Sequence, residues 1–138
     1  MVDKLHLEVV TPERKVFEAY VDSVEVPGLD GELGILPGHT ELISQLKPAG
    51  LLTYHQGDGK GEIAISEGLV EVSSNRVIIL SNRANRPEDI DLARALELKN
   101  LAEDRLHKAL TDPEMDIVCA AIELERASIE LHLAEKSP

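Results

Sequence analysis

Apolar and polar residues alternate in short stretches through the first part of the chain. The alternating apolar positions are Leu5, Leu7 and Val9; Val24 and Val26; Ile63 and Ile65; and Val70 and Val72. Alternation is typical of strands that bury one face, and turn residues such as Thr11-Pro12 and Pro27-Gly28 bound these stretches. The pattern predicts an all-β sandwich or barrel in this part of the chain.

The apolar period becomes helical from Pro87 onward. Pro87 suits a first helical turn, and the acidic residues that follow it favour the positive end of a helix. Apolar residues then recur at helical spacing, at Ala95, Leu98, Ala102, Leu106 and Ala109. The pattern predicts one helix of about five turns that begins near Pro87.

A second helix is expected after the interruption at Asp112-Pro113-Glu114. Either Asp112 or Asp116 can cap it. One of its faces carries Ile117, Ala121, Leu124 and Leu131, and a neighbouring face carries Ile122, Ile129 and Leu133. The short connection predicts an antiparallel hairpin. The wide apolar surface fits either packing on the sandwich alone or contact with the sandwich and a second protein.

Composition changes at the same place in the chain. All nine glycines lie at or before Gly68, whereas eight alanines follow residue 85 and only four precede it. Glycine suits turns and alanine suits helices. The predicted fold class is therefore α+β: an N-terminal β-sandwich over residues 1–85, followed by a C-terminal antiparallel two-helix hairpin over residues 86–138.

Charge and hydropathy narrow the classes of function. The chain has 26 acidic and 14 basic residues, a formal net charge of −12, which repels nucleic acids and anionic membrane surfaces. Apolar runs such as Val77–Leu80 are far shorter than the about 20 residues of a membrane span, and the first residues lack the regions of a signal peptide. We expect a cytoplasmic protein without a nucleic-acid partner.

No catalytic or metal-binding group is predicted. The five histidines, at positions 6, 39, 55, 107 and 132, show no ligand spacing. Cys119 lies among apolar neighbours, so we expect a buried or half-buried, inert thiol. The glycines from Gly57 to Gly61 predict a hairpin turn rather than a phosphate loop, because no helix and no Lys-Ser/Thr pair follow them.

The segment from Pro27 to His39 is rich in glycine and proline and is not expected to form an ordinary strand. Its glycines permit close backbone approach, and Pro37-Gly38 marks a turn that would project His39 and expose Glu32. Such a loop is either a docking edge or a connector.

Four segments together resemble the epsilon subunit of bacterial F-type ATP synthases. They are Gly31–Thr40, Leu5–Pro12, Ser66–Val72 and the alanine-rich helical tail. The resemblance implies a ten-stranded β-sandwich with two antiparallel helices and no catalytic residue. It also implies a rotor role in the central stalk, at the cytoplasmic face of the inner membrane, where the sandwich joins the gamma subunit to the c-subunit ring and couples proton flow to ATP synthesis.

The resemblance also assigns contact residues. It implies that Glu32 faces the c-ring and that His39 faces gamma; an ordinary solvated glutamate and a loop-stabilising histidine are the alternatives. The hairpin either folds down or extends to the catalytic alpha and beta subunits, where it opposes ATP hydrolysis. From Pro113 onward this chain has two basic residues against six acidic ones, so we expect weak inhibition.

The resemblance also implies that ATP is a regulatory ligand of the hairpin. The family's nucleotide motif is matched by Ile90, Asp91, Arg94 and Ala95, and a second phosphate-binding position by Arg126.

This chain differs from ATP-binding members of the family at two further positions. Those members have basic residues there, whereas this chain has Leu101 and Glu130, which weakens the site. We expect weak ATP binding or none. Helix architecture explains the motif equally well, with Asp91 at a helix start and an Asp91–Arg94 pair. A free-standing ATP-sensing module and a small hydrolase are the other functions to consider.

Overall fold

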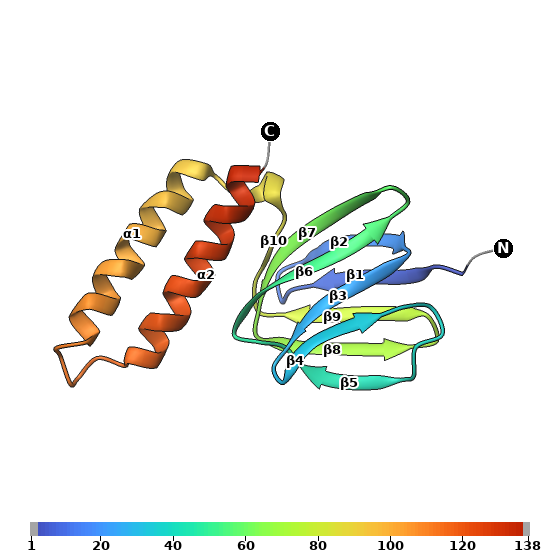
Figure 1. Ribbon diagram of the computed structural model, residues 1–138, viewed down its shortest axis with the longest axis horizontal. Coiled ribbons are helices and arrows are strands. Elements are labelled where there is room, and N and C mark those ends of the chain that lie inside the picture. Colours follow the sequence, from blue (N-terminus) through green and yellow to red (C-terminus); the bar gives the residue numbers. More distant parts are fainter. Residues whose placement is uncertain (1–2, 137–138) are drawn as a thin grey trace. The chain divides into compact units, whose positions relative to one another are not determined.

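The computed structural model describes residues 3–136, and the chain divides between Asn85 and Arg86 into two compact units (Figure 1). The first unit is all β and the second is helical. Within residues 3–136, no helix is long and apolar enough to span a membrane.

Ten strands build the first unit, so the prediction of a β-sandwich followed by two helices is confirmed. They are β1 (Leu5–Val10), β2 (Lys15–Val21), β3 (Ser23–Gly28), β4 (Gly31–Ile35), β5 (Leu42–Gln45), β6 (Ala49–Gln56), β7 (Gly59–Ser66), β8 (Gly68–Ser73), β9 (Arg76–Ser81) and β10 (Ala84–Asn85). One sheet has the order β2-β1-β9-β8-β5 and the other β10-β7-β6-β3-β4. All pairs are antiparallel except β1 with β9.

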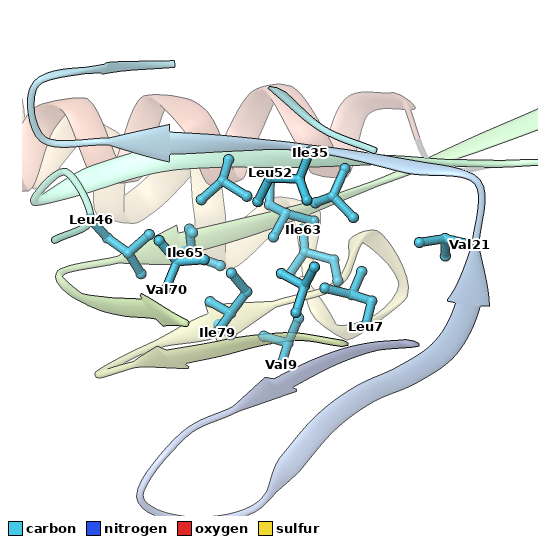
Figure 2. Packing of buried hydrophobic residues seen from close by; sticks show 14 of the residues in the cluster. Leu7, Val9, Val21, Ile35, Leu46, Leu52, Ile63, Ile65, Val70 and Ile79 are labelled. Carbon is cyan, nitrogen blue, oxygen red and sulfur yellow. The ribbon is translucent and has the colours of Figure 1, made fainter. Parts of the chain in front are cut away.

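The core of the sandwich consists of branched aliphatic side chains from both sheets (Figure 2). Leu7 and Ile79 come from one sheet and Leu52 and Ile63 from the other, and each is at most 1% exposed. Their alternation with outward residues is the pattern from which the strands were predicted. The two faces therefore bury a continuous apolar layer that holds the surface residues of the strands in fixed positions.

The glycine-rich segment is more regular than expected. Gly31–Ile35 forms β4, which pairs with β3 through a two-residue turn, so the prediction that this segment cannot be an ordinary strand was wrong. Gly28 permits the tight turn, because a Cβ there would lie 2.6 Å from the Gly31 oxygen. A second two-residue turn, Gly57-Asp58, joins β6 to β7 and confirms the predicted hairpin.

The second unit contains the 3₁₀ helix η1 (Pro87–Asp89) and the helices α1 (Leu92–Ala109) and α2 (Ile117–Lys136). The predicted start of the first helix near Pro87 was wrong. Ile90 is extended, with φ −102° and ψ 125°, and α1 begins only after its N-cap, Asp91. Asp116, one of the two caps considered, accepts hydrogen bonds from the backbone N–H groups of Val118 and Cys119 at the start of α2.

Alanines line the seam between the two antiparallel helices. They recur at every seventh position, at Ala95, Ala102 and Ala109 in α1 and at Ala120, Ala127 and Ala134 in α2, and all are buried. An ion pair between Arg105 and Glu123, 3.0 Å long, holds the same register. Such small side chains permit a close approach of the helix axes.

This seam corrects the predicted face of the second helix. Leu131 is buried, but Ile117 is 44% exposed and Ala121 is exposed as well. The alanine repeat, rather than the larger apolar residues, therefore decides which side of α2 faces α1.

Candidate functional site

Glu32 lies on the edge strand β4, opposite Pro27 of β3. Ile35 of the same strand is buried and Leu33 packs against the core, so alternation directs Glu32 outward, and it is exposed. Among residues 3–136 its carboxylate has no hydrogen bond or ion pair. A paired backbone thus presents a carboxylate that is available to a partner.

His39 lies at the end of a turn that the β8–β9 turn holds in place. The Gly38 N–H donates to Asn75 Oδ1 at 2.7 Å, and the His39 N–H donates to the Leu36 oxygen at 3.1 Å. The His39 ring is half-buried, and its Nδ1 donates to the Thr40 carbonyl at 2.6 Å. This tautomer leaves Nε2 as an acceptor.

Glu32 and His39 are not brought together. The turn that precedes Glu32 bonds to the end of β5, through the Leu29 N–H and the Gln45 oxygen, 2.9 Å apart. His39 precedes the start of β5. The two residues therefore belong to opposite ends of the sandwich, which suits two separate contacts.

Exposed apolar residues on the sheet β2-β1-β9-β8-β5 were missed in the sequence analysis. Ile43 is 70% exposed, Leu69 42% and Leu80 45%. Leu69 and Leu80 are directly opposite each other in β8 and β9. We call Ile43, Leu69 and Leu80 the outer apolar face. A signal for it was the unbroken run Val77–Leu80, because a run without alternation is typical of a strand covered on both sides.

A charge cluster occupies the β1–β2 side of the same sheet. The two His6 ring nitrogens face different carboxylates: Nε2 lies 2.7 Å from Glu18 and Nδ1 3.7 Å from Glu8. Glu8 is also 2.8 Å from Arg76, and Lys15 is 3.1 Å from Glu18. The hydrogen bond from Lys15, followed by that from His6, lowers the pKa of Glu18, and the bond to Glu18 raises the pKa of Lys15.

This cluster is better described as an ion-pair network than as a metal site. Potential ligand atoms of His6, Glu8 and Glu18 lie within 4.8 Å of one another. However, Lys15 and Arg76 already neutralise both carboxylates, and a divalent cation would lie beside these two positive charges.

The nucleotide motif is mainly explained by the start of α1. Asp91 Oδ1 accepts hydrogen bonds from the Ala93 and Arg94 N–H groups, 3.0 and 3.3 Å long. The alternative Asp91–Arg94 side-chain pair was wrong, because the Arg94 guanidinium pairs with Glu97 at 3.2 Å. Ala95 is buried in the seam and Ile90 is half-buried.

Arg126 lies apart from that motif. The Arg105–Glu123 ion pair sets the register of the two helices and places Arg126 near the level of Ala102 in α1. That level is eight residues from Arg94, or about 12 Å along the hairpin, given a rise of about 1.5 Å per residue.

The Nε of Arg126 is buried and has no hydrogen-bond partner among the described residues. Glu130, one turn further on, is buried and would repel a phosphate. Only an extended anion could reach both arginines.

Cys119 is exposed, so the prediction of a buried or half-buried thiol was wrong. Its Sγ–H donates to Asp116 Oδ2 at 3.2 Å, and this bond raises the pKa of the thiol. Hydrogen bonds from Cys119, first from its backbone N–H, lower the pKa of Asp116. The arrangement favours the protonated thiol, which is the unreactive form.

Known families match both units. Residues 4–87 match the family described as ATP synthase, Delta/Epsilon chain, beta-sandwich domain, and residues 88–135 the family described as ATP synthase, Delta/Epsilon chain, long alpha-helix domain. The ATP synthase epsilon chain of Desulforamulus reducens is 40% identical over 135 residues, which cover 98% of this chain and 100% of that protein. The ATP synthase epsilon chain of Carboxydothermus hydrogenoformans is 47% identical over 106 residues, 77% of this chain and 78% of that one.

A solved structure has the same fold. A chain in the cryo-EM structure of the Euglena gracilis mitochondrial ATP synthase, OSCP/F1/c-ring in rotational state 1, matches with a TM-score of 0.77 at 24% identity. The match covers 98% of this chain and 83% of that chain.

Proposed function

The chain belongs to the ATP synthase delta/epsilon family, and on this premise we propose that it is a non-catalytic rotor subunit of the central stalk of an F-type ATP synthase. In this role it couples proton flow through the c-ring to ATP synthesis and regulates ATP hydrolysis through its helical hairpin. The observation that carries the proposal is a rigid sandwich that exposes the outer apolar face and, at one end, the carboxylate of Glu32, which has no partner among residues 3–136.

Docking on the gamma subunit is assigned to the outer apolar face together with His39. Ile43, Leu69 and Leu80 are large side chains exposed on adjacent strands, and burying such a face against a partner stabilises a complex by about 25 cal/mol per Å². The His39 turn leads directly into β5, which carries Ile43. A gamma surface that covers Ile43 would therefore also reach His39.

Contact with the c-ring is assigned to Glu32. Its carboxylate is exposed and lies on a strand whose backbone is paired along β3, so little backbone entropy is lost when a cation or an N–H donor binds it. Because Glu32 and His39 lie at opposite ends of the sandwich, two separate contacts allow the sandwich to transmit rotation between ring and shaft. Since the c-ring lies in the membrane, its contact with Glu32 would hold the chain at the cytoplasmic face of the membrane.

Regulation is assigned to the hairpin, which contacts the catalytic alpha and beta subunits when it extends. The seam is made of alanines, whose burial contributes less than that of leucines, so an exchange of partners changes the free energy little. The acidic end of the chain, with two basic against six acidic residues from Pro113 onward, opposes attraction to an acidic surface. We therefore propose weak inhibition of hydrolysis.

ATP as a ligand of the hairpin is a second candidate function, and the buried, unpartnered Nε of Arg126 favours it. Glu130 and the distance from Arg94 oppose tight binding. We expect weak binding or none in an ATP titration followed by NMR, and any saturable shifts should disappear in Arg126→Gln. A tight, stoichiometric complex with ATP would instead favour a free-standing nucleotide sensor.

Cysteine cross-linking tests the two docking contacts. The single natural cysteine, Cys119, is exposed and is first replaced by serine. In the reconstituted synthase, Glu32→Cys should cross-link to the c-ring and His39→Cys to gamma. Asp58→Cys, in the exposed β6–β7 turn, is the control and should cross-link to neither.

Cross-linking of Glu32→Cys to gamma and of His39→Cys to the c-ring would contradict the assignment. Cross-linking of Asp58→Cys as efficient as that of the two variants would contradict it as well. Inhibition is tested in the same preparation by removal of residues 86–138. Little change in ATP hydrolysis is expected, and a strong rise on removal would refute weak inhibition.

A further inference from the structure

The turn that carries His39 has little apolar packing of its own. It closes through the hydrogen bond from the His39 N–H to the Leu36 oxygen. Leu36 is 62% exposed, and Gly38, with φ 85°, has no side chain. Because few buried contacts hold such a segment, its conformation depends on polar contacts with the rest of the sandwich.

Asn75, in the turn between β8 and β9, makes such a contact. Its Oδ1 accepts the hydrogen bond from the Gly38 N–H at 2.7 Å. Its backbone oxygen accepts a second bond, 2.8 Å long, from the N–H of His6 in β1. Asn75 therefore joins the His39 turn to the first strand and to the β8–β9 turn, which are distant from one another in sequence.

The backbone of the β8–β9 turn fixes the position of this side chain. Ser74 and Asn75 have φ of 48° and 61°, and the residues on either side of them, Ser73 and Arg76, are paired. Positive φ at both central residues is typical of the tightest hairpin turns, and asparagine adopts it more readily than most residues. Glycine would fit this backbone as well but has no acceptor, so the amide oxygen is what asparagine contributes here.

The hydrogen bond to Gly38 fixes the chain immediately before His39. Since the His39 Nδ1 donates to the Thr40 oxygen at 2.6 Å, Nε2 is the ring atom that can accept a hydrogen bond from a partner. A turn that is already in its binding conformation presents Nε2 without a cost of ordering. If that conformation were only partly populated, the affinity for the partner would fall by the same fraction.

We propose that Asn75 is a positioning residue for docking on gamma: its side chain holds the turn that presents His39 to an N–H or O–H donor of that subunit. The inference rests on the proposed function, because it concerns the same contact between His39 and gamma. It adds a residue that acts through His39 and takes part before gamma binds.

Affinity of the full chain for purified gamma tests the proposal. Asn75→Gly keeps a backbone that suits positive φ and removes Oδ1, so it should weaken binding about fivefold, the effect of one hydrogen bond. Asn75→Asp keeps an acceptor and should bind gamma within about twofold of the wild type. Ser74→Gly is the matched control, because it changes the same turn at the other position of positive φ and leaves the acceptor in place; it should bind as the wild type does.

Two further measurements separate positioning from a general loss of structure. In the free chain, amide hydrogen exchange at Gly38 should accelerate in Asn75→Gly and stay slow in Asn75→Asp and Ser74→Gly. In a chain that already carries His39→Ala, Asn75→Gly should weaken gamma binding no further, because its effect passes through His39. Unchanged circular dichroism and thermal midpoints establish that the variants remain folded.

Wild-type affinity for gamma in Asn75→Gly would overturn the inference and leave the proposed function intact. A further loss of about fivefold in the His39→Ala background would overturn it too, because Asn75 would then act by another route. A wild-type chain that does not bind gamma would overturn the proposed function itself, and the inference with it.

Discussion

The two units of the chain bury different kinds of side chain. In the sandwich, leucine, isoleucine and valine from distant strands are at most a few per cent exposed, as Leu52, Ile63 and Ile79 illustrate. In the hairpin, alanines line the seam, and among the larger apolar side chains of the described residues only Leu131 and Leu133 are buried. Leu92, Leu96 and Leu110 are at least 50% exposed. Since buried area sets the apolar contribution to stability, the sandwich is the stable unit and the hairpin the one that opens more readily.

This difference suits the proposed division of work. A part that transmits rotation must not deform, and a part that regulates must change its partner. Substitutions that destabilise one unit and leave the stability of the other unchanged would therefore support this difference between the units. Substitutions that destabilise both units together would contradict it.

The largest effect is expected for Ile79→Ala in the sandwich core. Ile79 is fully buried, so the cavity should lower the free energy of unfolding by about 2–5 kcal/mol. Leu80→Ala, at the next position but 45% exposed, is the control and should change it much less. Urea denaturation measures both. Equal effects at the two positions would contradict the burial of Ile79 and the exposure of Leu80.

A smaller effect, confined to the hairpin, is expected for Ala102→Leu. The larger side chain overfills the seam and should reduce helix-pair stability by about 1–3 kcal/mol. Amide hydrogen exchange should accelerate in α1 and α2 and stay unchanged in the β-strands. Asn100→Leu places the same side chain at an exposed position and should have little effect. Acceleration throughout the sandwich would indicate that the two units unfold as one.

Loss of the α1 cap should have a more local effect. Asp91→Ala removes the acceptor of two backbone N–H groups and should destabilise the first turn of α1 by about 1 kcal/mol. Asp91→Asn keeps a capping oxygen and should retain most of the stability. Exchange rates at Ala93 and Arg94 measure the effect, and equal exchange in both variants would show that charge rather than capping matters at this position.

The smallest effect is the pH dependence of the exposed Lys15–Glu18 pair. The pKa of Glu18 is lowered in the folded chain, so its contribution is complete above the ordinary value of 4.5 and is lost as pH falls through the lowered pKa. The pKa of Lys15 is raised, so its contribution is complete below 10.5 and is lost as pH rises through the raised value. Compared with the wild type, Lys15→Gln should lose less stability between pH 5 and pH 3. If both chains lost the same stability between pH 5 and pH 3, the Lys15–Glu18 pair would be excluded as the source of that loss.

Local sequence patterns were sufficient to predict those elements whose burial follows a single periodicity. Alternation of buried and exposed residues predicts strands such as β1 and β8, and helical spacing predicts both helices. The start of α1 was misplaced because Pro87–Asp89 forms a separate 3₁₀ turn, and acidic residues after a proline are equally compatible with either structure. Strand β4 was missed because Gly34 lies outward on an edge strand, where no side chain is needed for packing.

The candidate sites depend on contacts that no local pattern reveals. Glu32 and His39 were named from a resemblance, but only strand pairing places them at opposite ends of the sandwich. The outer apolar face combines Ile43, Leu69 and Leu80 from three strands, and its formation requires the register of the whole sheet. Likewise, the separation of Arg126 from Arg94 follows from the alanine register, which becomes evident only when both helices are paired.

The most direct test compares the binding of two chains to purified gamma: the full chain and a version that ends at Asn85. Because the core and the outer apolar face lie entirely within the first unit, both should fold and bind gamma with affinities that agree within about twofold. Binding by the full chain alone would assign the main contact to the hairpin, and binding by neither would contradict the rotor role.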